Sequence, residues 1–172
     1  MEFKTRKRNR KKGFDYSSEQ IYFVTICTND KTHDFGLVEK DCMILNGNGR
    51  IAEEQIHWLE AQYPYLEIHN AVVMPNHVHI LFQIDIRKEH KSLKIKSVSE
   101  LMGAYKTTVS KMMHLNGHDT FRWQRSFHDH IVRDANGYEN IYHYISDNPV
   151  RWHNDVHNNS KITTVGTGCD LS

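Results

Sequence analysis

The sequence predicts an α+β domain with a ferredoxin-like sandwich, in which helices pack on a mainly antiparallel sheet. Segments rich in β-branched and aromatic residues alternate with segments in which apolar residues recur at helical spacing. Some predicted strands follow one another through tight turns, whereas others are separated by a helix. The 172 residues suffice for one such domain and leave little room for a second. The predicted order of elements is β-(β)-α-β-β-α-β-α, in which the parentheses mark a short strand.

The first half of the chain is predicted to contain two strands and a helix. Residues 21–28 are rich in β-branched and aromatic side chains, which are typical of a strand. After a polar turn, a shorter strand occupies residues 43–45 and ends in the turn-forming sequence Asn-Gly-Asn-Gly at 46–49. Apolar residues then recur at helical spacing, and Pro64 ends that helix near Tyr63.

The second half is predicted to contain three strands and two helices. Pro75 and Asn76 make a tight connection between two long strands. Ser97 and Glu100 have the spacing of a capping box, which marks the start of a helix. Pro149 breaks the last helix, because its ring cannot continue a helical backbone. The predicted strands are 66–74, 77–86 and 127–132, and the predicted helices are 97–115 and 136–148.

The composition is that of a soluble globular protein, with 38% hydrophobic and 25% charged residues. No apolar run approaches the ~18 residues that a membrane span requires, and the N-terminus is basic rather than signal-like. The three cysteines, Cys27, Cys42 and Cys169, lie far apart and form no Cys-x-x-Cys motif. A disulfide framework or a cysteine-built zinc site is therefore not expected, and we predict a cytoplasmic protein without a membrane partner.

The positive charge is concentrated at the N-terminus. The formal net charge of the chain is +1, but residues 1–12 carry +6 and the remaining 160 residues carry −5. Mutual repulsion and a lack of apolar spacing leave this segment nothing to pack against. We therefore predict a flexible basic arm at residues 1–18, a single domain at 19–157 and a polar, poorly ordered tail at 158–172.

Two histidine pairs have the spacing of side chains that share one face of a strand. His77 and His79 begin the strand at 77–86, and His128 and His130 lie in the strand at 127–132. Two neighbouring imidazoles can form half of a metal site. They can equally be two hydrogen-bonded histidines at the edge of a sheet, and spacing alone does not choose between the two pairs.

The last predicted helix carries a second candidate group. Tyr144 and Asn148 are four residues apart, so they stand one helical turn apart on a shared face. An oxygen of Asn148 could complete a His-His-Asn metal site and place Tyr144 beside the metal. The alternative is an amphipathic helix with a buried tyrosine and an asparagine that ends the helix before Pro149.

The sequence Asn-His-Val-His-Ile at 76–80, followed about sixty residues later by Tyr-Ile-x-x-Asn-Pro-Val at 144–150, resembles the single-tyrosine HUH transposases. These are the small transposases of insertion sequences and their REP-associated relatives. The similarity covers roughly residues 20–152, and further matching segments lie in the same order at 49–51, 73–75 and 127–134.

The resemblance implies a role for each candidate residue. His77 and His79 would bind a divalent metal, Mg²⁺ or Mn²⁺, and Tyr144 would be the nucleophile. Asn148 would complete the metal site; many insertion-sequence members have glutamine there, whereas REP-associated members look more like this chain. His128 and His130 fall in a family-typical segment without an assigned catalytic role, so we interpret them as structural.

The implied activity is that of a metal-dependent single-stranded DNA endonuclease and strand transferase, which acts through a 5′-phosphotyrosine on hairpin-associated DNA. The alternative is a domesticated nucleic-acid-binding protein of the same fold that has lost cleavage. A rolling-circle replication initiator or relaxase shares the paired histidines, but these proteins are usually larger. Family members act as homodimers or as monomers, and nothing in the apolar pattern of the last helix decides between them.

DNA binding is predicted to be mainly electrostatic and therefore strongly dependent on salt. Phe14, Tyr16 and Trp123 are candidates for stacking on bases, although packing in the core is the alternative for each. The basic residues predicted to contact phosphates are Lys4, Arg6, Lys7, Arg8, Arg10, Lys11, Lys12, Lys106, Lys111, Arg122, Arg125 and Arg133.

Overall fold

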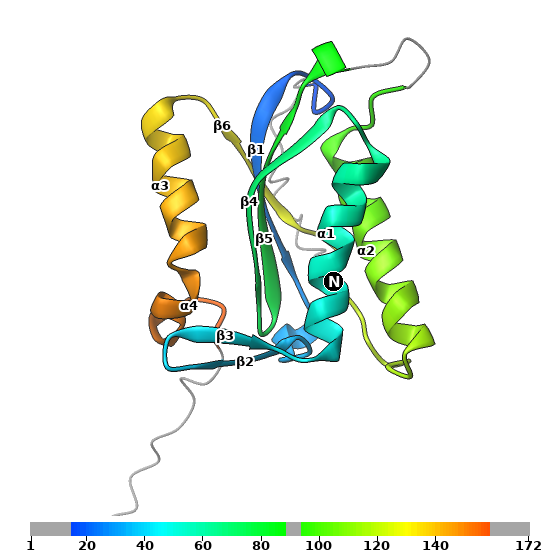
Figure 1. The fold of residues 1–172 in the computed structure, drawn as a ribbon, viewed down its shortest axis with the longest axis vertical. Helices are drawn as coiled ribbons and strands as arrows, with labels where there is room; N and C mark the ends of the chain where they lie inside the picture. Colours follow the sequence, from blue (N-terminus) through cyan, green and yellow to red (C-terminus); the bar gives the residue numbers. More distant parts are fainter. Residues whose placement is uncertain (1–14, 89–93, 159–172) are drawn as a thin grey trace, which may run out of the picture.

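A four-stranded antiparallel sheet with strand order β4-β5-β1-β6 forms the centre of the molecule (Figure 1). The structure is a computed structural model that describes residues 15–88 and 94–158. The predicted α+β class, with an antiparallel sheet and packed helices, is confirmed. The strands of this sheet are β1 (Gln20–Cys27), β4 (Leu66–Met74), β5 (His77–Ile84) and β6 (His128–Val132).

Helices cover both faces of the sheet. α1 (Gly47–Gln62) and α2 (Val98–Leu115) pack on one face, and α3 (Ala135–Ser146) lies on the other (Figure 1). Because side chains alternate along a strand, Val24, Val78 and Ile80 enter the large core beneath α1 and α2. The opposite face has a much smaller apolar cluster, centred on Leu81 and Ile145. The two faces therefore differ, and the buried polar side chains of Thr25, His77 and His79 lie on the face with the smaller cluster.

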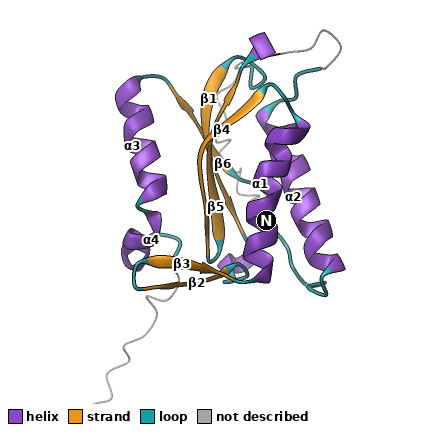
Figure 2. Ribbon diagram, viewed as in Figure 1, coloured by secondary structure: helices purple, strands orange, loops and turns teal. Residues whose placement is uncertain are grey.

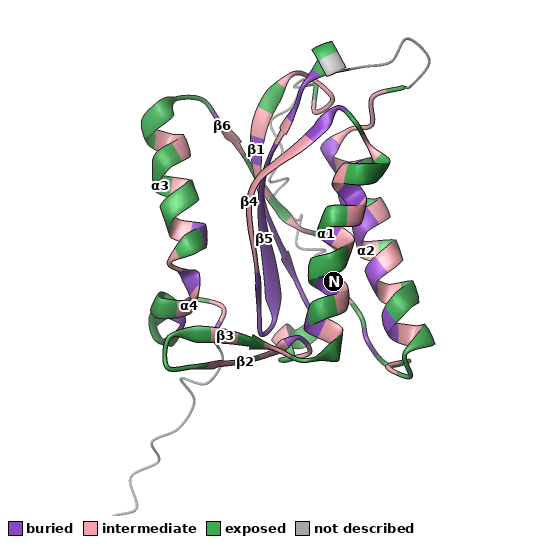
Figure 3. Ribbon diagram, in the orientation of Figure 1, coloured by how far each residue is buried: buried purple, intermediate pink, exposed green. Residues whose placement is uncertain are grey.

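α3 is attached to the sheet through few buried side chains. Ile145 is its only buried residue, and most of the helix is exposed or partly exposed (Figure 3). By contrast, α2 buries six residues against the core. None of the helices within residues 15–88 and 94–158 is long and apolar enough to cross a membrane.

The start of α1 differs from the prediction. The sequence at 46–49, predicted to be a turn, contains the N-cap of α1 and its first residues: the side chain of Asn46 accepts a hydrogen bond from the backbone N–H of Gly49. Gly49 is required at this position because a Cβ atom would lie 2.2 Å from the backbone oxygen of Phe35. The predicted capping box of Ser97 and Glu100 at the start of α2 is confirmed.

A small hairpin forms a separate two-stranded sheet across one end of the main sheet (Figure 2). It consists of β2 (Gly36–Glu39) and β3 (Cys42–Leu45), of which only β3 was predicted. The turn between them is made by Lys40 and Asp41, both with positive φ. Such turns usually contain Gly or Asn, so the sequence lacks the common signal for this hairpin.

The predicted last helix at 136–148 is interrupted. α3 ends at Ser146, and a short helix α4 (Asn148–Arg151) begins after Asp147, where the backbone leaves the helical conformation (φ −87°, ψ 1°). Pro149 lies at the start of α4, where its missing N–H is not needed. The remaining short 3₁₀ helices are Asn29–Lys31, Ile86–Lys88 and Trp152–Asn154.

Candidate active site

The first histidine pair lies at the start of β5, on the face of the sheet that α3 covers. His77 and His79 are 0% and 1% exposed, and their Nε2 atoms are 3.1 Å apart. The Nδ1 atom of His77 lies 2.9 Å from Oδ1 of Asn76. The Nδ1 atom of His79 lies 2.9 Å from Oγ1 of Thr25. Both rings are thus held through Nδ1 and direct Nε2 toward a common point.

Asn76 determines which nitrogen of His77 carries the proton. The Nδ2 of Asn76 donates to the backbone oxygens of Lys31 at 3.2 Å and His157 at 2.8 Å, so Oδ1 is left to accept. Nδ1 of His77 therefore donates to this oxygen, and Nε2 retains its lone pair. A neighbouring group that fixes the tautomer in this way is typical of metal-binding histidines.

Both imidazoles are neutral at pH 7. Burial lowers the pKa of His77 well below its ordinary value, and the nearby His157 lowers it further. Burial also lowers the pKa of His79 well below its ordinary value, with His77 and His157 acting in the same direction. Neutral imidazole is the form that binds metal ions, so the protein environment favours the ligand form of both side chains.

Tyr144 lies beside this pair. Its ring centroid is 5.2 Å from that of His79, and it meets the ring of Phe23 edge-on at 6.2 Å. The adjacent Ile145 is fully buried and anchors this turn of α3. Half-burial raises the pKa of Tyr144, and the negative charge of Asp155 raises it further. The phenol is therefore protonated at neutral pH and has to lose its proton to act as a nucleophile.

The Asn148 amide is buried and has no hydrogen-bond partner. The residue is 0% exposed, and neither Oδ1 nor Nδ2 makes a hydrogen bond of good geometry among the described residues. The amide nevertheless lies close enough to the ring of His77 to raise its pKa, and close enough to Tyr144 to lower the pKa of the phenol. Leaving such a group unpaired costs about 1–3 kcal/mol, so this amide faces a position that suits a ligand.

These donors fit a divalent cation. Two ligands at right angles and about 2.1 Å from one ion are about 3.0 Å apart, close to the 3.1 Å between the Nε2 atoms of His77 and His79. Within the described ranges, no three His, Cys, Asp or Glu side chains form a metal-binding group. The side-chain oxygen of Asn148 is a further group of the kind that can bind such an ion. The structure brings together His77, His79, Tyr144 and Asn148, the four residues that the sequence singled out.

Two further residues of this site were not predicted. The ring centroid of His157 is 4.5 Å from that of His77 and 6.3 Å from that of His79. Asp155 is buried, and its Oδ1 accepts a hydrogen bond from the backbone N–H of His157. Both follow the last helix in a polar segment without periodicity, so no sequence pattern distinguishes them from the tail that follows.

A hollow of about 800 Å³ lies on the side of the sheet opposite to the histidine pair. It is lined by four of the five predicted DNA-binding cations that lie within the described residues. It lies between α2 and the segment 119–125, and its cations are Lys106, Lys111, Arg122 and Arg125. Arg133 lies apart, just before α3. The seven cations of the arm, Lys4, Arg6, Lys7, Arg8, Arg10, Lys11 and Lys12, and Phe14 lie outside the described residues.

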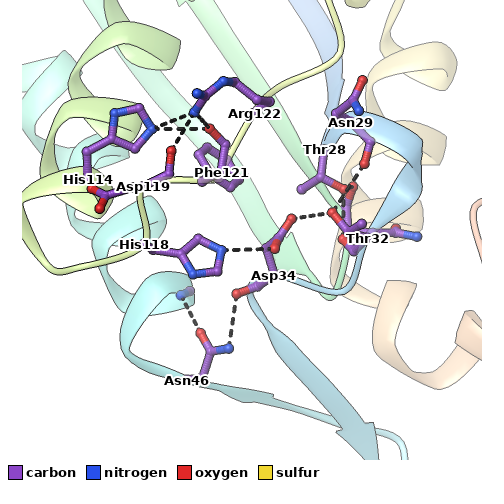
Figure 4. A network of polar contacts seen from close by, with 12 residues as sticks. Thr28, Asn29, Thr32, Asp34, Asn46, His114, His118, Asp119, Phe121 and Arg122 are labelled. Carbon is purple, nitrogen blue, oxygen red and sulfur yellow. Dashed lines mark hydrogen bonds and ion pairs between the residues drawn. The ribbon is translucent and has the colours of Figure 1, made fainter.

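Two of these four cations are bound to backbone carbonyls. The Nζ of Lys106 donates to the oxygens of Gln124 and Arg125. The guanidinium of Arg122 donates to the oxygens of Asp119 and Phe121 (Figure 4). Both therefore shape the wall of the hollow. Arg122, Lys111 and Arg125 are exposed, and Lys106 is partly exposed.

The wall of the hollow is fixed to the turn after β1 by a polar network (Figure 4). Asp34 lies 3.2 Å from Nε2 of His118, and its backbone oxygen accepts a hydrogen bond from Asn46, the N-cap of α1. The aromatic candidates pack within the protein: Trp123 lies against Phe35 and donates to a backbone oxygen of α2, and Tyr16 stacks on Tyr22.

The neutral histidines make the stability of the protein depend on pH. The folded pKa of His77 and of His79 lies below the ordinary value near 6.5, so below this pH the unfolded chain binds protons that the folded chain does not. The free energy of unfolding is therefore expected to fall with decreasing pH below about 6.5, by up to about 1.4 kcal/mol per pH unit for each histidine. Urea unfolding between pH 7.5 and 5 measures this slope.

His77→Gln should flatten this pH dependence, because glutamine takes up no proton. His57→Gln, which changes an exposed residue of α1, is the matched control and should keep the original slope. If the unfolding free energy has the same slope against pH in all three proteins, His77 takes up its proton in the folded state as it does in the unfolded chain.

This chain is similar to known proteins in both sequence and fold. Over 164 residues it is 31% identical to an uncharacterised protein of Haemophilus influenzae, and the alignment covers 87% of this chain and 91% of that protein. A solved structure of a REP-associated tyrosine transposase bound to a REP hairpin matches with a TM-score of 0.56 at 20% identity, over 83% of this chain and 72% of that one. No protein-family model matches the sequence. The predicted resemblance is thus confirmed as a shared fold.

Proposed function

Since this chain belongs to the same family as the Haemophilus influenzae protein and has the fold of a REP-associated tyrosine transposase, we propose that it cuts and rejoins single-stranded DNA. The proposed activity is a metal-dependent transesterification through a 5′-phosphotyrosine, on DNA next to a hairpin. One observation carries the proposal: the ring of Tyr144 lies beside two facing imidazoles and a buried amide without a partner.

In the proposed reaction, the oxygen of Tyr144 attacks the phosphorus of a phosphodiester. A tyrosine–phosphorus bond forms as the bond to the 3′-oxygen breaks, and the departing oxygen takes a proton to become a 3′-hydroxyl. A later attack by a 3′-hydroxyl on the phosphotyrosine rejoins the DNA and restores the phenol. Asp155, whose carboxylate lies close enough to raise the pKa of Tyr144, is assigned as the acceptor of the phenolic proton.

His77, His79 and Asn148 would hold the divalent ion, Mg²⁺ or Mn²⁺. When bound, such an ion supplies positive charge that withdraws electron density from the scissile phosphate. The protein contributes the positioning: the Nδ1 contacts to Asn76 and Thr25 fix the imidazoles before any ligand arrives. The partial burial of Tyr144 excludes water from one side of the nucleophile.

The proposal is tested by incubating the full chain with labelled single-stranded oligonucleotides from both flanks of its own gene. Mn²⁺, Mg²⁺ or EDTA is included, and products are resolved on a denaturing gel. We expect a covalent protein–DNA adduct that requires the metal, with the DNA mapped by mass spectrometry to the peptide that contains Tyr144. Metal-independent, salt-sensitive binding without an adduct on any oligonucleotide would instead favour a binding protein that has lost cleavage.

Part of the binding to DNA phosphates is assigned to the hollow beside α2. Because Lys111 and Arg125 are exposed there, replacing both with alanine should lower the magnitude of the slope of log K against log [salt] by about 2. Fluorescence anisotropy at several salt concentrations measures this slope. Lys94→Ala, an exposed change near the opposite end of α2, is the control. An unchanged slope in the double variant would assign the phosphate contacts to another surface.

A further inference from the structure

The face of the sheet that carries Tyr144 is only partly covered. α3 packs mainly on β4 and β5, and it leaves β1 and the edge strand β6 more accessible. His128 and His130 of β6 are exposed, and Phe23 of β1 is partly exposed. We call this accessible part of β1 and β6 the open strip. It lies beside the nucleophile, because the ring of Phe23 meets that of Tyr144 at 6.2 Å.

The second histidine pair lies on the same face of the sheet as the first. Thr25 pairs across the sheet with both His79 and His128, and side chains at paired positions share a face. His128 is therefore two strands from His79, or about 10 Å at the usual spacing of strands. His130 follows two residues along β6 on the same face. His128 and His130, which were interpreted as structural from the sequence, thus border the proposed site.

A hollow of about 660 Å³ lies at the far end of the open strip, between the sheet and the first turn of α3. Two aromatic rings contribute to it, since His69 and Tyr138 meet edge-on with ring centroids 5.5 Å apart. The Nδ1 atom of His69 is inaccessible and has no hydrogen-bond partner among the described residues. Gln83 and Arg133 add amide and guanidinium groups to the lining. Glu19 and Asp134 add carboxylates, which already pair with Arg87 and with the backbone N–H of Gly137.

The chemistry of this surface fits a single DNA strand. Stacking on aromatic rings binds any unpaired base, and amide groups such as that of Gln83 hydrogen-bond to base edges. Imidazole and guanidinium groups along the strip can donate to phosphate oxygens. The strip from His128 to Val132 measures about 13 Å, which spans about four nucleotides at the B-form rise and fewer in an extended strand.

We propose that the open strip holds the DNA strand that adjoins the scissile phosphate, and that the hollow beside Tyr138 takes one base of that strand. Phosphates of the strand lie along His128, His130 and Arg133. This inference rests on the proposed function, because it takes the position of the scissile phosphate from Tyr144. It also gives Arg133 a place separate from the other predicted DNA-binding cations.

Photocrosslinking tests the inference. The full-length Tyr144→Phe protein is bound to an oligonucleotide that carries 5-iodouracil at one position, moved stepwise along the strand, and crosslinked peptides are identified by mass spectrometry. We expect neighbouring positions to crosslink to Phe23 and Tyr138 in turn. Crosslinks confined to the hollow beside α2 would overturn the inference. Substitutions in the open strip that change the oligomeric state and leave DNA binding unchanged would also overturn it.

Two variants complete the test. Tyr138→Ala with Arg133→Ala should weaken binding of a hairpin with a single-stranded flank about tenfold, as expected for losing one stacked base and one phosphate contact. Binding of the hairpin stem alone should not change. Tyr138→Phe keeps the ring and is the matched control, and thermal melting verifies folding. If the wild-type protein forms the adduct on Tyr144 but all variants bind the flanked hairpin equally well, the proposed function stands and the open strip is rejected. If the wild-type protein forms no adduct, the proposed function itself is rejected.

Discussion

Replacing Tyr144 with phenylalanine is expected to abolish the covalent protein–DNA adduct, a loss of at least about 10⁴-fold in the cleavage rate. The change removes only the attacking oxygen. The phenyl ring retains its contacts with Phe23 and His79, so the fold and the affinity for uncleaved DNA should stay within about 1 kcal/mol of the original. Adduct formation on a denaturing gel and anisotropy of uncleaved DNA measure the two effects separately.

Tyr142→Phe is the matched control on the same helix. Tyr142 is exposed, and the hydrogen bonds it accepts from Asn70 and Ser146 go to its backbone oxygen, which the substitution leaves in place. This variant should form the adduct at the original rate. An adduct that persists in Tyr144→Phe would assign the nucleophile to another residue, and mass spectrometry of that adduct would identify it.

Replacing His79 with alanine is expected to remove metal binding and, with it, at least about 10³-fold of the cleavage rate. The wild-type protein should gain thermal stability when Mn²⁺ is added, because a ligand that binds only the folded state stabilises it by about 2.7 kcal/mol at a concentration one hundred times its Kd. The variant should show no such gain. Calorimetric titration with Mn²⁺ provides a second readout that does not depend on cleavage.

His57→Ala controls for the loss of an imidazole elsewhere, since His57 is exposed on α1 and belongs to the opposite face of the sheet. It should retain the full stabilisation by Mn²⁺. Equal stabilisation of the wild-type, His57→Ala and His79→Ala proteins would show that the ion binds away from the histidine pair.

The main elements of the fold follow from local sequence patterns. The aromatic and β-branched run that forms β1 and the capping box at Ser97 each have a direct physical meaning, and the structure contains both elements. Strand β2 of the small hairpin was not predicted, because the turn residues Lys40 and Asp41 adopt positive φ although neither is glycine or asparagine. Its paired apolar residues Leu37 and Ile44 are exposed, so no burial pattern marks β2.

The candidate site was predictable where its residues lie on regular elements. Strand periodicity places His77 and His79 on one face, whereas the predicted single helix that relates Tyr144 to Asn148 is interrupted between them at Asp147. The surroundings of these residues depend on contacts distant in sequence, which no local pattern encodes. Thr25 reaches His79 only because β1 pairs with β5, and the segment that contains His157 returns to the pair only after the last helix has ended.

The break at Asp147 divides the candidate catalytic residues between two separately anchored segments. Tyr144 belongs to α3, which has a single buried residue, whereas Asn148 starts α4 and is itself fully buried. A rotation of α3 about Asp147 would move Tyr144 away from the histidine pair and leave His77, His79 and Asn148 in their original positions. The two steps of the proposed reaction could thus place different demands on the two segments, because α3 can change position without moving the buried Asn148.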